Sequence, residues 1–386
     1  MGGSDRQARM AFYELVVMGA PSDEQITGLR KHISPLIQSF GLELGKEVTW
    51  SVLPIAFEPD QLVPAAVAFF GREGVSDAGL SSLLDAGVPI LPIVSHDGRV
   101  STEIPAQLRV LNCVNMAKDG LDRIATALLE CVGLLPRQRR VFLSYRRDEA
   151  RQAALQLFNS FSGRLFDVFL DTHGIPPAEH FQSVLWHRLC DSDVLVMLDT
   201  PGYFQSRWTS AEFGRALAKN ISVLRVGWPG VSLSPRAATA SSIDLNASDV
   251  DEGTGQLTEA VIGRICTQLE LVRAQSHAVR TLNLFSSLKL AIEQIKGTVA
   301  GVGTHNAIYL KLPDGKDIVA YPAVGVPTSI TLNEAVERAF TAVVYDHVGL
   351  DERWVRHLSW LGEHIHSARW VKASEAAWVF AGWGVP

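Results

Sequence analysis

Residues 140–228 decide the fold, through the segments VFLSYRR (141–147), FDVFLD (166–171), DVLVMLD (193–199), SRWTSAEFGRAL (206–217) and ISVLRVG (221–227). Four of these segments are short apolar runs typical of buried strands, and the fourth in chain order has the spacing of a helix. Buried strands that alternate with helices predict a parallel sheet covered on both faces. Ligands of such sheets bind beyond the carboxyl ends of the strands. We therefore expect the chemistry in the loops that begin at Arg146, Asp171 and Asp199.

The order and spacing of these segments resemble the TIR (Toll/interleukin-1 receptor) domain family, and most closely its NAD-cleaving members. The segments that carry the resemblance are VFLSYRRDEA, FDVFLDTHGIPPAEHF, LCDSDVLVMLD and SRWTSAEFGRAL, within residues 139–271. The resemblance implies a flavodoxin-like α/β fold that takes NAD⁺ as a substrate and needs no bound cofactor. Two departures are the prolines of the loop HGIPPAEH and the long Ser/Ala-rich region after Trp228.

The resemblance also assigns roles to residues. The family's W-x-x-x-E motif falls on Trp208 and Glu212, which implies that Glu212 is the catalytic carboxylate. The implied substrate-binding residues are Trp208 with the strand-one motif, which falls on Ser144, Tyr145, Arg146 and Arg147, and the ends of the family's mobile loop, Asp171 and Phe181.

The chemistry of Trp208 and Glu212 fits these roles. Their spacing of four residues places them on one face of a helix, one turn apart. Cleavage of the nicotinamide–ribose bond builds positive charge on the sugar, which a fixed carboxylate stabilises. Arg146 and Arg147 have the guanidinium geometry that matches a pyrophosphate. The alternative readings are a solvated Glu212 with Trp208 in the core, and arginines that are only part of the surface.

Composition excludes several other classes of protein. The chain has 386 residues, enough for two or three domains, and 47% are hydrophobic against 20% charged, which favours a large core over disorder. A net charge of −6 argues against broad nucleic-acid binding. The four cysteines have no C-x-x-C spacing, and His364 and His366 have no further ligand at metal spacing, so we expect reduced thiols and no metal. No apolar run approaches ~20 residues and no signal peptide is present, so we expect a cytoplasmic protein without a membrane segment.

Residues 1–136 predict a second α/β domain. AAVAFFGREGVSDAGLSSLLDAGVPILPIV aligns with DVLVMLDTPGYFQSRWTSAEFGRALAKNISVLRV as strand, loop, helix and strand, which is an internal repeat. This copy has no W-x-x-x-E motif, so we expect a degenerate TIR-like domain that binds a partner, senses a ligand or assists assembly. Any two flavodoxin-like domains could align in this way, and that alternative stays open.

Residues 137–274 then form the expected TIR domain, and residues 275–386 a smaller α+β module. The module is expected to contain a helix at 281–297, a hairpin at 306–323 around Pro313-Asp314-Gly315, and a helix over Thr331–Gly349 that opens with the capping-box pair Thr331 and Glu334. Five tryptophans follow, at positions 354, 360, 370, 378 and 383. They fit either a ligand cage or interface, or the core of a small helical cap.

We therefore expect a TIR-domain NAD⁺ glycohydrolase that acts as a homo-oligomer and resembles prokaryotic anti-phage effectors of cell-suicide immunity. In that family two TIR protomers commonly complete one active site. An unidentified ligand or protein partner is expected to trigger assembly. Two other functions stay open: a non-catalytic TIR scaffold, and a cyclase that makes a messenger of the cyclic ADP-ribose type.

Overall fold

The computed structural model describes residues 11–60, 62–170 and 181–383. Two compact units, Met1–Arg137 and Gln138–Pro386, divide the chain, and each is described by itself. Within the described residues, no helix is both long enough and apolar enough to cross a membrane.

The first unit is built on a parallel sheet in the order β2-β1-β3-β4-β5. Its strands are β1 (Tyr13–Gly19), β2 (Val48–Val52), β3 (Ala65–Phe70), β4 (Ile90–Val94) and β5 (Val114–Asn115), and its helices are α1 (Asp23–Gln38), α2 (Leu80–Asp85), α3 (Val100–Glu103) and α4 (Met116–Cys131). Ser22 caps α1 in a capping box with Gln25.

The second unit begins with another parallel sheet, in the order β10-β9-β8-β6-β7. Its strands are β6 (Arg140–Ser144), β7 (Asp167–Leu170), β8 (Val194–Asp199), β9 (Ser222–Gly227) and β10 (Ser241–Asp244), and its helices are α5 (Arg147–Gly163), α6 (Phe181–Asp191), α7 (Arg207–Ala218) and α8 (Glu259–Gln294). In both parallel sheets the first strand lies between the second and the third, which is the flavodoxin-like order. The α/β fold predicted from the sequence is confirmed.

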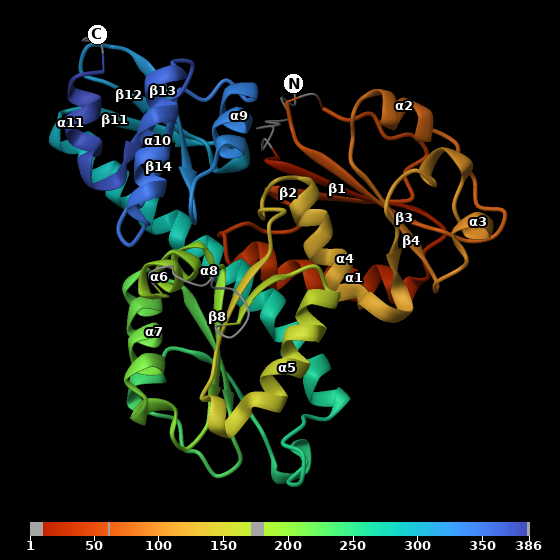
Figure 1. Cartoon of the computed structure of the whole chain (residues 1–386). Helices are drawn as coiled ribbons and strands as arrows, with labels where there is room; N and C mark the ends of the chain where they lie inside the picture. The colour runs from red at the N-terminus through yellow and green to blue at the C-terminus, as the bar shows by residue number, and fades with distance from the viewer. Residues whose placement is uncertain (1–10, 61, 171–180, 384–386) are drawn as a thin grey trace, which may run out of the picture. The chain divides into compact units, whose positions relative to one another are not determined.

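Helices cover both faces of the β6–β10 sheet (Figure 1). Leu157 and Phe161 of α5 share one buried core with Ile265 and Leu269 of α8. On the opposite face, the core contains side chains of α6 and α7, Leu185, Leu189, Phe213 and Ala216. The helix that carries Glu212 is therefore fixed to the sheet from one side by apolar packing.

A mixed sheet in the order β11-β12-β13-β14-β15 completes the second unit. Its strands are β11 (Thr298–Val302), β12 (Ile308–Lys311), β13 (Asp317–Ala323), β14 (Ala342–Tyr345) and β15 (Arg369–Lys372), and its further helices are α9 (Ser329–Glu337), α10 (Glu352–His364) and α11 (Ala376–Ala381). α8 and α11 pack on one face of this sheet, and α9 and α10 on the other. β12 and β13 pair antiparallel and Gly315 has a φ of 85°, which confirms the predicted hairpin and its turn.

A single helix joins the two halves of this unit. α8 has 36 residues, about 54 Å at 1.5 Å per residue. Its first half packs into the core under β6–β10, and its second half, through Leu288 and Ile292, into the core under β11–β15. Ala274, the predicted last residue of the TIR domain, lies inside this helix.

The helix predicted over Thr331–Gly349 is wrong in extent. α9 begins at Ser329, two residues after Pro327, is capped by Thr328 instead of Thr331, and ends at Glu337. Ala339 has a left-handed φ of 57°, which no helix continues. The following strand β14 is buried at every position and lies between β13 and β15, where its two valines suit an interior strand better than a helix.

The tryptophans after α9 divide between core and surface. Trp354 and Trp370 pack against the core beneath α9 and α10, and Trp383 against the core beneath α8 and α11. Trp360 is 53% exposed and Trp378 is 84% exposed. The cluster is therefore neither a closed cage nor a single core.

Candidate functional site

The candidate site lies where the first and third strands of the second unit leave the sheet. β6 pairs with β7 on one side and β8 on the other, so the connections from β6 and β8 run to opposite faces. Doubly wound sheets bind ligands at this switch point, beyond the carboxyl ends of the strands. Ser144 is the last residue of β6, and Asp199 is the last of β8.

Glu212 reaches the switch point from α7. A turn after β8 leads through Tyr203 to the N-cap residue Ser206, whose side chain accepts a hydrogen bond from the Thr209 backbone. Thr209 Oγ1 donates to the backbone carbonyl of Tyr203, which ties the turn to the helix. Glu212 follows in the next turn of α7 and is only 6% exposed.

Ser144, Tyr203 and Glu212 form one hydrogen-bonded group, here named the switch-point cluster. Ser144 Oγ donates to Glu212 Oε2 at 2.5 Å and lies 2.7 Å from Tyr203 Oη. A serine hydroxyl has one proton, so when it points at the carboxylate, the Tyr203 hydroxyl must donate to Ser144 Oγ. The protons therefore point toward Glu212 along the chain Tyr203–Ser144–Glu212, as suits an ionised carboxylate.

Tyr203 keeps its proton. Burial raises the pKa of its phenol well above the ordinary value, and the charge of Glu212 raises it further, although the hydrogen bond with Ser144 acts in the opposite direction. The ring is completely buried, and it meets Phe204 edge to face with 5.2 Å between centroids. Tyr203 can therefore donate a hydrogen bond but cannot act as a base near neutral pH.

Trp208 lies four residues before Glu212 on α7, nearer to the surface. Its side chain is 39% exposed, and the Arg207 guanidinium lies over its ring, 4.6 Å from the centroid. The helix thus presents a buried carboxylate and a partly exposed indole in successive turns, the spacing that the sequence predicts.

The strand-one residues have divergent environments. Tyr145 is buried in the core between the sheet and α5. Arg146 Nη1 binds Glu149 Oε1 at 2.8 Å, and Glu149 Oε2 accepts from the Gly202 backbone at 3.0 Å, so this pair links the start of α5 to the turn after β8. Arg147 is exposed at the start of α5. The structure brings Ser144 to Glu212, but it does not place Tyr145 beside them.

The other predicted site residues lie at the edge of the described structure. Asp171 lies outside the described residues, and Phe181 is described only as the first residue of α6, without its side chain. The predicted loop contacts therefore stay predictions. Among the described residues, no group of three or more His, Cys, Asp or Glu could hold a metal ion.

Sequence reasoning missed three features of this region. Tyr203 was not identified, although an aromatic residue directly after the Pro201-Gly202 turn at a strand end was a usable signal. Asp199 is bound by the fully buried Arg225, with Nε and Oδ2 2.5 Å apart. Burial raises the pKa of Asp199, and the Arg225 hydrogen bond opposes the shift. Thr200 is 2% exposed, and its Oγ1 has no hydrogen-bond partner among the residues that the structure describes.

Comparison with known proteins identifies this region. Residues 141–258 match the family model described as the TIR domain. No curated protein matches the sequence. Among solved structures, a PurR family transcriptional regulator from Vibrio parahaemolyticus RIMD 2210633 has 13% identity, with 67% of this chain and 94% of that chain covered and a TM-score of 0.18.

Proposed function

From the premise that residues 141–258 of this chain are a TIR domain, we propose that the protein is an NAD⁺ glycohydrolase with Glu212 as its catalytic carboxylate. The observation that carries the proposal is the buried Glu212, held by Ser144 Oγ at 2.5 Å where β6 and β8 leave the sheet. This is the place where flavodoxin-like sheets bind nucleotides. A carboxylate oriented there suits a substrate that develops positive charge next to a ribose.

The reaction that we propose needs one ionised carboxylate. The bond between ribose C1′ and the nicotinamide nitrogen breaks, and its electron pair leaves with the nicotinamide. Because nicotinamide departs as a neutral molecule, no acid has to protonate it, unlike the alcohol that leaves in glycoside hydrolysis. Glu212 stabilises the positive charge on the sugar and can accept hydrogen bonds from its hydroxyls. Water adds to C1′ and loses a proton, which gives ADP-ribose.

Ser144 and Tyr203 are positioning residues in this scheme. The Ser144 hydroxyl fixes one oxygen of Glu212, and the neutral Tyr203 fixes Ser144. A carboxylate that is oriented before substrate binds pays less reorganisation in the transition state. Within residues 11–60, 62–170 and 181–383, the buried Thr200 hydroxyl, directly after β8, has no hydrogen-bond partner. Because an unpaired buried hydroxyl costs about 1–3 kcal/mol, a polar substrate atom at this end of the strand would satisfy it.

The remaining contacts with NAD⁺ are also proposed. Trp208 offers an aromatic wall, and Arg147 a cation, at the same end of the sheet. Asp171 and Phe181 are proposed to close on the substrate, as the family resemblance implies. Arg146 is engaged with Glu149, so its effect on the pyrophosphate is expected to be weak.

Activity is proposed to require assembly of TIR domains, with the active site completed by a second protomer. The biological role proposed with it is destruction of NAD⁺ in anti-phage immunity. Support for both comes from the family resemblance of the motifs around Ser144 and Glu212.

A non-catalytic TIR scaffold is the second candidate, because the bond from Ser144 would equally hold Glu212 as a structural carboxylate. The test is NAD⁺ turnover by the full chain at high protein concentration with a crowding agent. Mass spectrometry separates free ADP-ribose, which supports the hydrolase, from a cyclic product, which makes the protein a cyclase. Absence of nicotinamide release from an assembled sample would favour the scaffold.

A further inference from the structure

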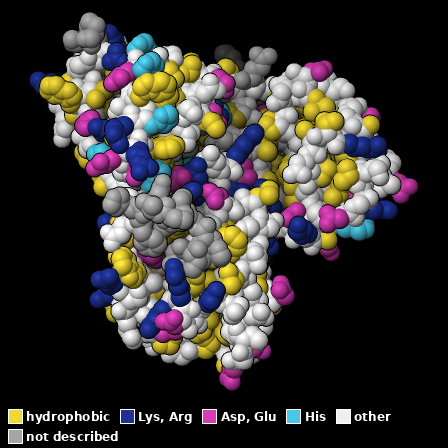
Figure 2. Space-filling view, viewed as in Figure 1, with side chains coloured by type: hydrophobic (Ala, Val, Ile, Leu, Met, Phe, Trp, Pro, Cys, Tyr) yellow, Lys and Arg dark blue, Asp and Glu magenta, His cyan; other side chains and the backbone are white. Residues whose placement is uncertain are grey.

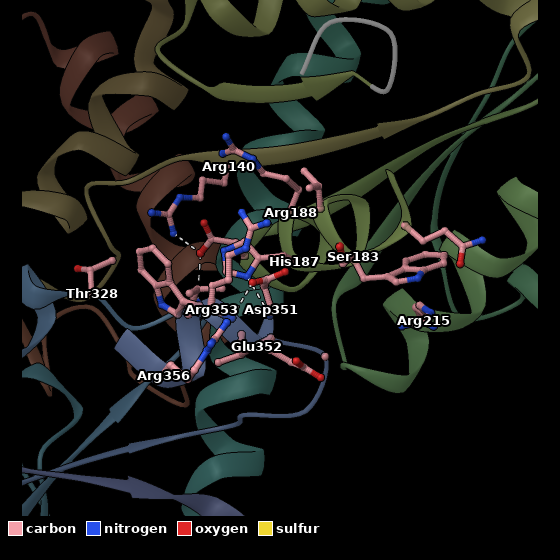
Figure 3. Close-up of a pocket in the computed structure, with 18 residues that line it drawn as sticks. Arg140, Ser183, His187, Arg188, Arg215, Thr328, Asp351, Glu352, Arg353 and Arg356 are labelled. Carbon is pink, nitrogen blue, oxygen red and sulfur yellow. Dashed lines mark hydrogen bonds and ion pairs between the residues drawn. The ribbon is translucent and has the colours of Figure 1, made fainter. Parts of the chain in front are cut away.

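A cavity of about 950 Å³ lies within the second unit, away from the switch-point cluster. One wall comes from α6 and α7, and the other from the segment before α9 and from α10 with its preceding loop (Figure 3). No residue of the switch-point cluster lines it. Its volume is at the upper end of the range, about 300–1,000 Å³, that small-molecule sites have.

The cavity is positively charged in a chain whose net charge is −6. Five arginines line it, Arg140, Arg188, Arg215, Arg353 and Arg356, against three acidic residues, Asp191, Asp351 and Glu352. The excess of two positive charges comes from the wall of α6 and α7, where Arg140, Arg188 and Arg215 outnumber Asp191. On the wall of α10, two arginines balance two carboxylates. On the face shown in Figure 2, Lys, Arg and His side chains gather over the region that carries α10.

Two of these arginines, Arg188 and Arg356, are exposed and can reach an anion. Arg140 is committed to Asp191, with Nη1 and Oδ1 2.5 Å apart. Arg188 is exposed, and its ion pair with the exposed Asp167 is long, with Nη1 and Oδ2 3.8 Å apart. Arg356 is exposed and makes no ion pair or hydrogen bond with a side chain in the described part of the chain. Figure 3 shows Arg188, Arg353 and Arg356 around His187, with Arg215 further along the cavity.

Aromatic side chains line the same cavity. Trp354 is held by a hydrogen bond from its Nε1 to the Pro327 carbonyl at 2.8 Å, and its ring lies 5.5 Å from that of His187. His187 Nδ1 accepts from the Asp351 backbone at 3.4 Å, and burial lowers the pKa of this imidazole. At the Arg215 end, the guanidinium lies 3.8 Å from the centroid of the Trp186 ring. Cations and aromatic faces thus alternate along the cavity.

We propose that this cavity binds a nucleotide that carries two or more phosphates. Guanidinium groups match phosphate oxygens in charge and geometry, and Arg188 of α6 and Arg356 of α10 provide two of them, one from each wall. A flat base gains stacking energy against indole and imidazole rings, which a plain inorganic anion does not. The site is distinct from the proposed NAD⁺ site, because Ser144, Tyr203 and Glu212 take no part in it.

The test is isothermal titration calorimetry of the full chain with ADP, GDP, CDP and UDP, and with adenosine and inorganic pyrophosphate as partial ligands. At least one of the nucleoside diphosphates should bind, with a lower Kd than pyrophosphate. Adenosine should bind only weakly. Arg356→Ala should raise Kd by about tenfold or more, since it removes a charge-assisted contact. The matched control is Arg338→Ala at the C-cap of α9, which removes a half-buried arginine paired with Glu334 outside the cavity.

Three results would overturn the proposal: no diphosphate binds at 1 mM, which is about the weakest affinity of interest; Arg356→Ala and Arg338→Ala bind equally; or pyrophosphate binds as tightly as the best diphosphate. Circular dichroism confirms that both variants are folded. Binding is measured without NAD⁺ turnover, so failure of the glycohydrolase proposal leaves this test intact.

A consequence for activity rests on the proposed function. Arg215 follows Glu212 by three residues on α7, so a ligand in the cavity contacts the helix that holds the proposed catalytic carboxylate. Saturation with the diphosphate that binds should therefore change the rate of nicotinamide release, and Arg356→Ala should abolish that change. Unchanged turnover in the saturated wild type would overturn this link to α7.

Discussion

Replacement of Ser144 by alanine tests whether the switch-point cluster positions Glu212. The substitution removes the hydroxyl that donates to Glu212 Oε2 at 2.5 Å and that lies 2.7 Å from Tyr203 Oη. Little volume is lost, so the sheet around β6 should remain intact. Tyr203→Phe is the matched variant, because it removes only the outer hydrogen bond and keeps the ring packed against Phe204.

The two variants should differ in magnitude. A hydrogen bond to a charged group contributes about 1.5–3 kcal/mol, and 1.36 kcal/mol corresponds to a tenfold change in rate. Ser144→Ala should therefore lower kcat by about 10- to 100-fold. Tyr203→Phe removes a bond between neutral groups, worth about 1 kcal/mol, and should lower kcat by less than about tenfold. Ser144→Ala also leaves the fully buried Tyr203 hydroxyl unpaired, at a stability cost of about 1–3 kcal/mol.

The assay is nicotinamide release at saturating NAD⁺, with urea unfolding of the same samples to separate loss of activity from loss of fold. A Ser144→Ala protein that is folded and works within twofold of wild type would refute the positioning of Glu212 by Ser144. A larger loss of activity in Tyr203→Phe than in Ser144→Ala would refute the order of the hydrogen-bond chain.

Three further predictions concern packing, pH and substrate binding. Gly227→Ala should destabilise the second unit by about 1–3 kcal/mol in urea unfolding, because the added Cβ would lie 2.4 Å from a nitrogen of the buried Arg225. The control is Gly214→Ala on α7, where the added Cβ meets open space and should stabilise the unit by about 0.5–1 kcal/mol. Equal effects of the two substitutions would contradict this packing. Burial lowers the pKa of His277 from 6.5 to about 4. As the pH falls below 6.5, this histidine becomes protonated in the unfolded chain before it does so in the folded chain. The free energy of unfolding is therefore highest above pH 6.5 and decreases as the pH falls toward 4. His277→Gln should reduce the loss of stability between pH 7 and 5, by up to about 2 kcal/mol, and an unchanged pH profile would contradict it. Trp208→Ala should raise KM for NAD⁺ about tenfold with Tm unchanged, because the indole is partly exposed, and an unchanged KM would remove it from the substrate site.

Much of the fold could be predicted from local patterns. Apolar runs such as VFLSYRR and DVLVMLD mark β6 and β8, and the W-x-x-x-E spacing places Trp208 and Glu212 on successive turns of α7. The meeting of Ser144 with Glu212 follows once β6 and β8 are neighbours in a parallel sheet. These are short-range signals combined with one rule of sheet topology.

The features that could not be predicted depend on long-range contacts. Whether TAVVY is the end of a helix or a strand is decided by β13 and β15, which lie on either side of β14. The buried ion pair of Arg225 and Asp199 joins β9 to β8, and the sequence around each residue does not indicate the pairing. The arginine-lined cavity combines α6 with α10, which are more than 150 residues apart in sequence.

Nicotinamide release by wild type, Glu212→Gln and Glu103→Gln tests the central claim most directly. Glu103 is the matched control, because it is also buried, at 7% exposure, and also accepts a serine hydroxyl, Ser95 Oγ at 2.7 Å, but belongs to the first unit. We predict that Glu212→Gln loses at least about 100-fold in rate while it stays folded, and that Glu103→Gln retains turnover. Turnover by folded Glu212→Gln within a few-fold of wild type, or an equal loss in Glu103→Gln, would contradict the assignment of Glu212 as the catalytic carboxylate.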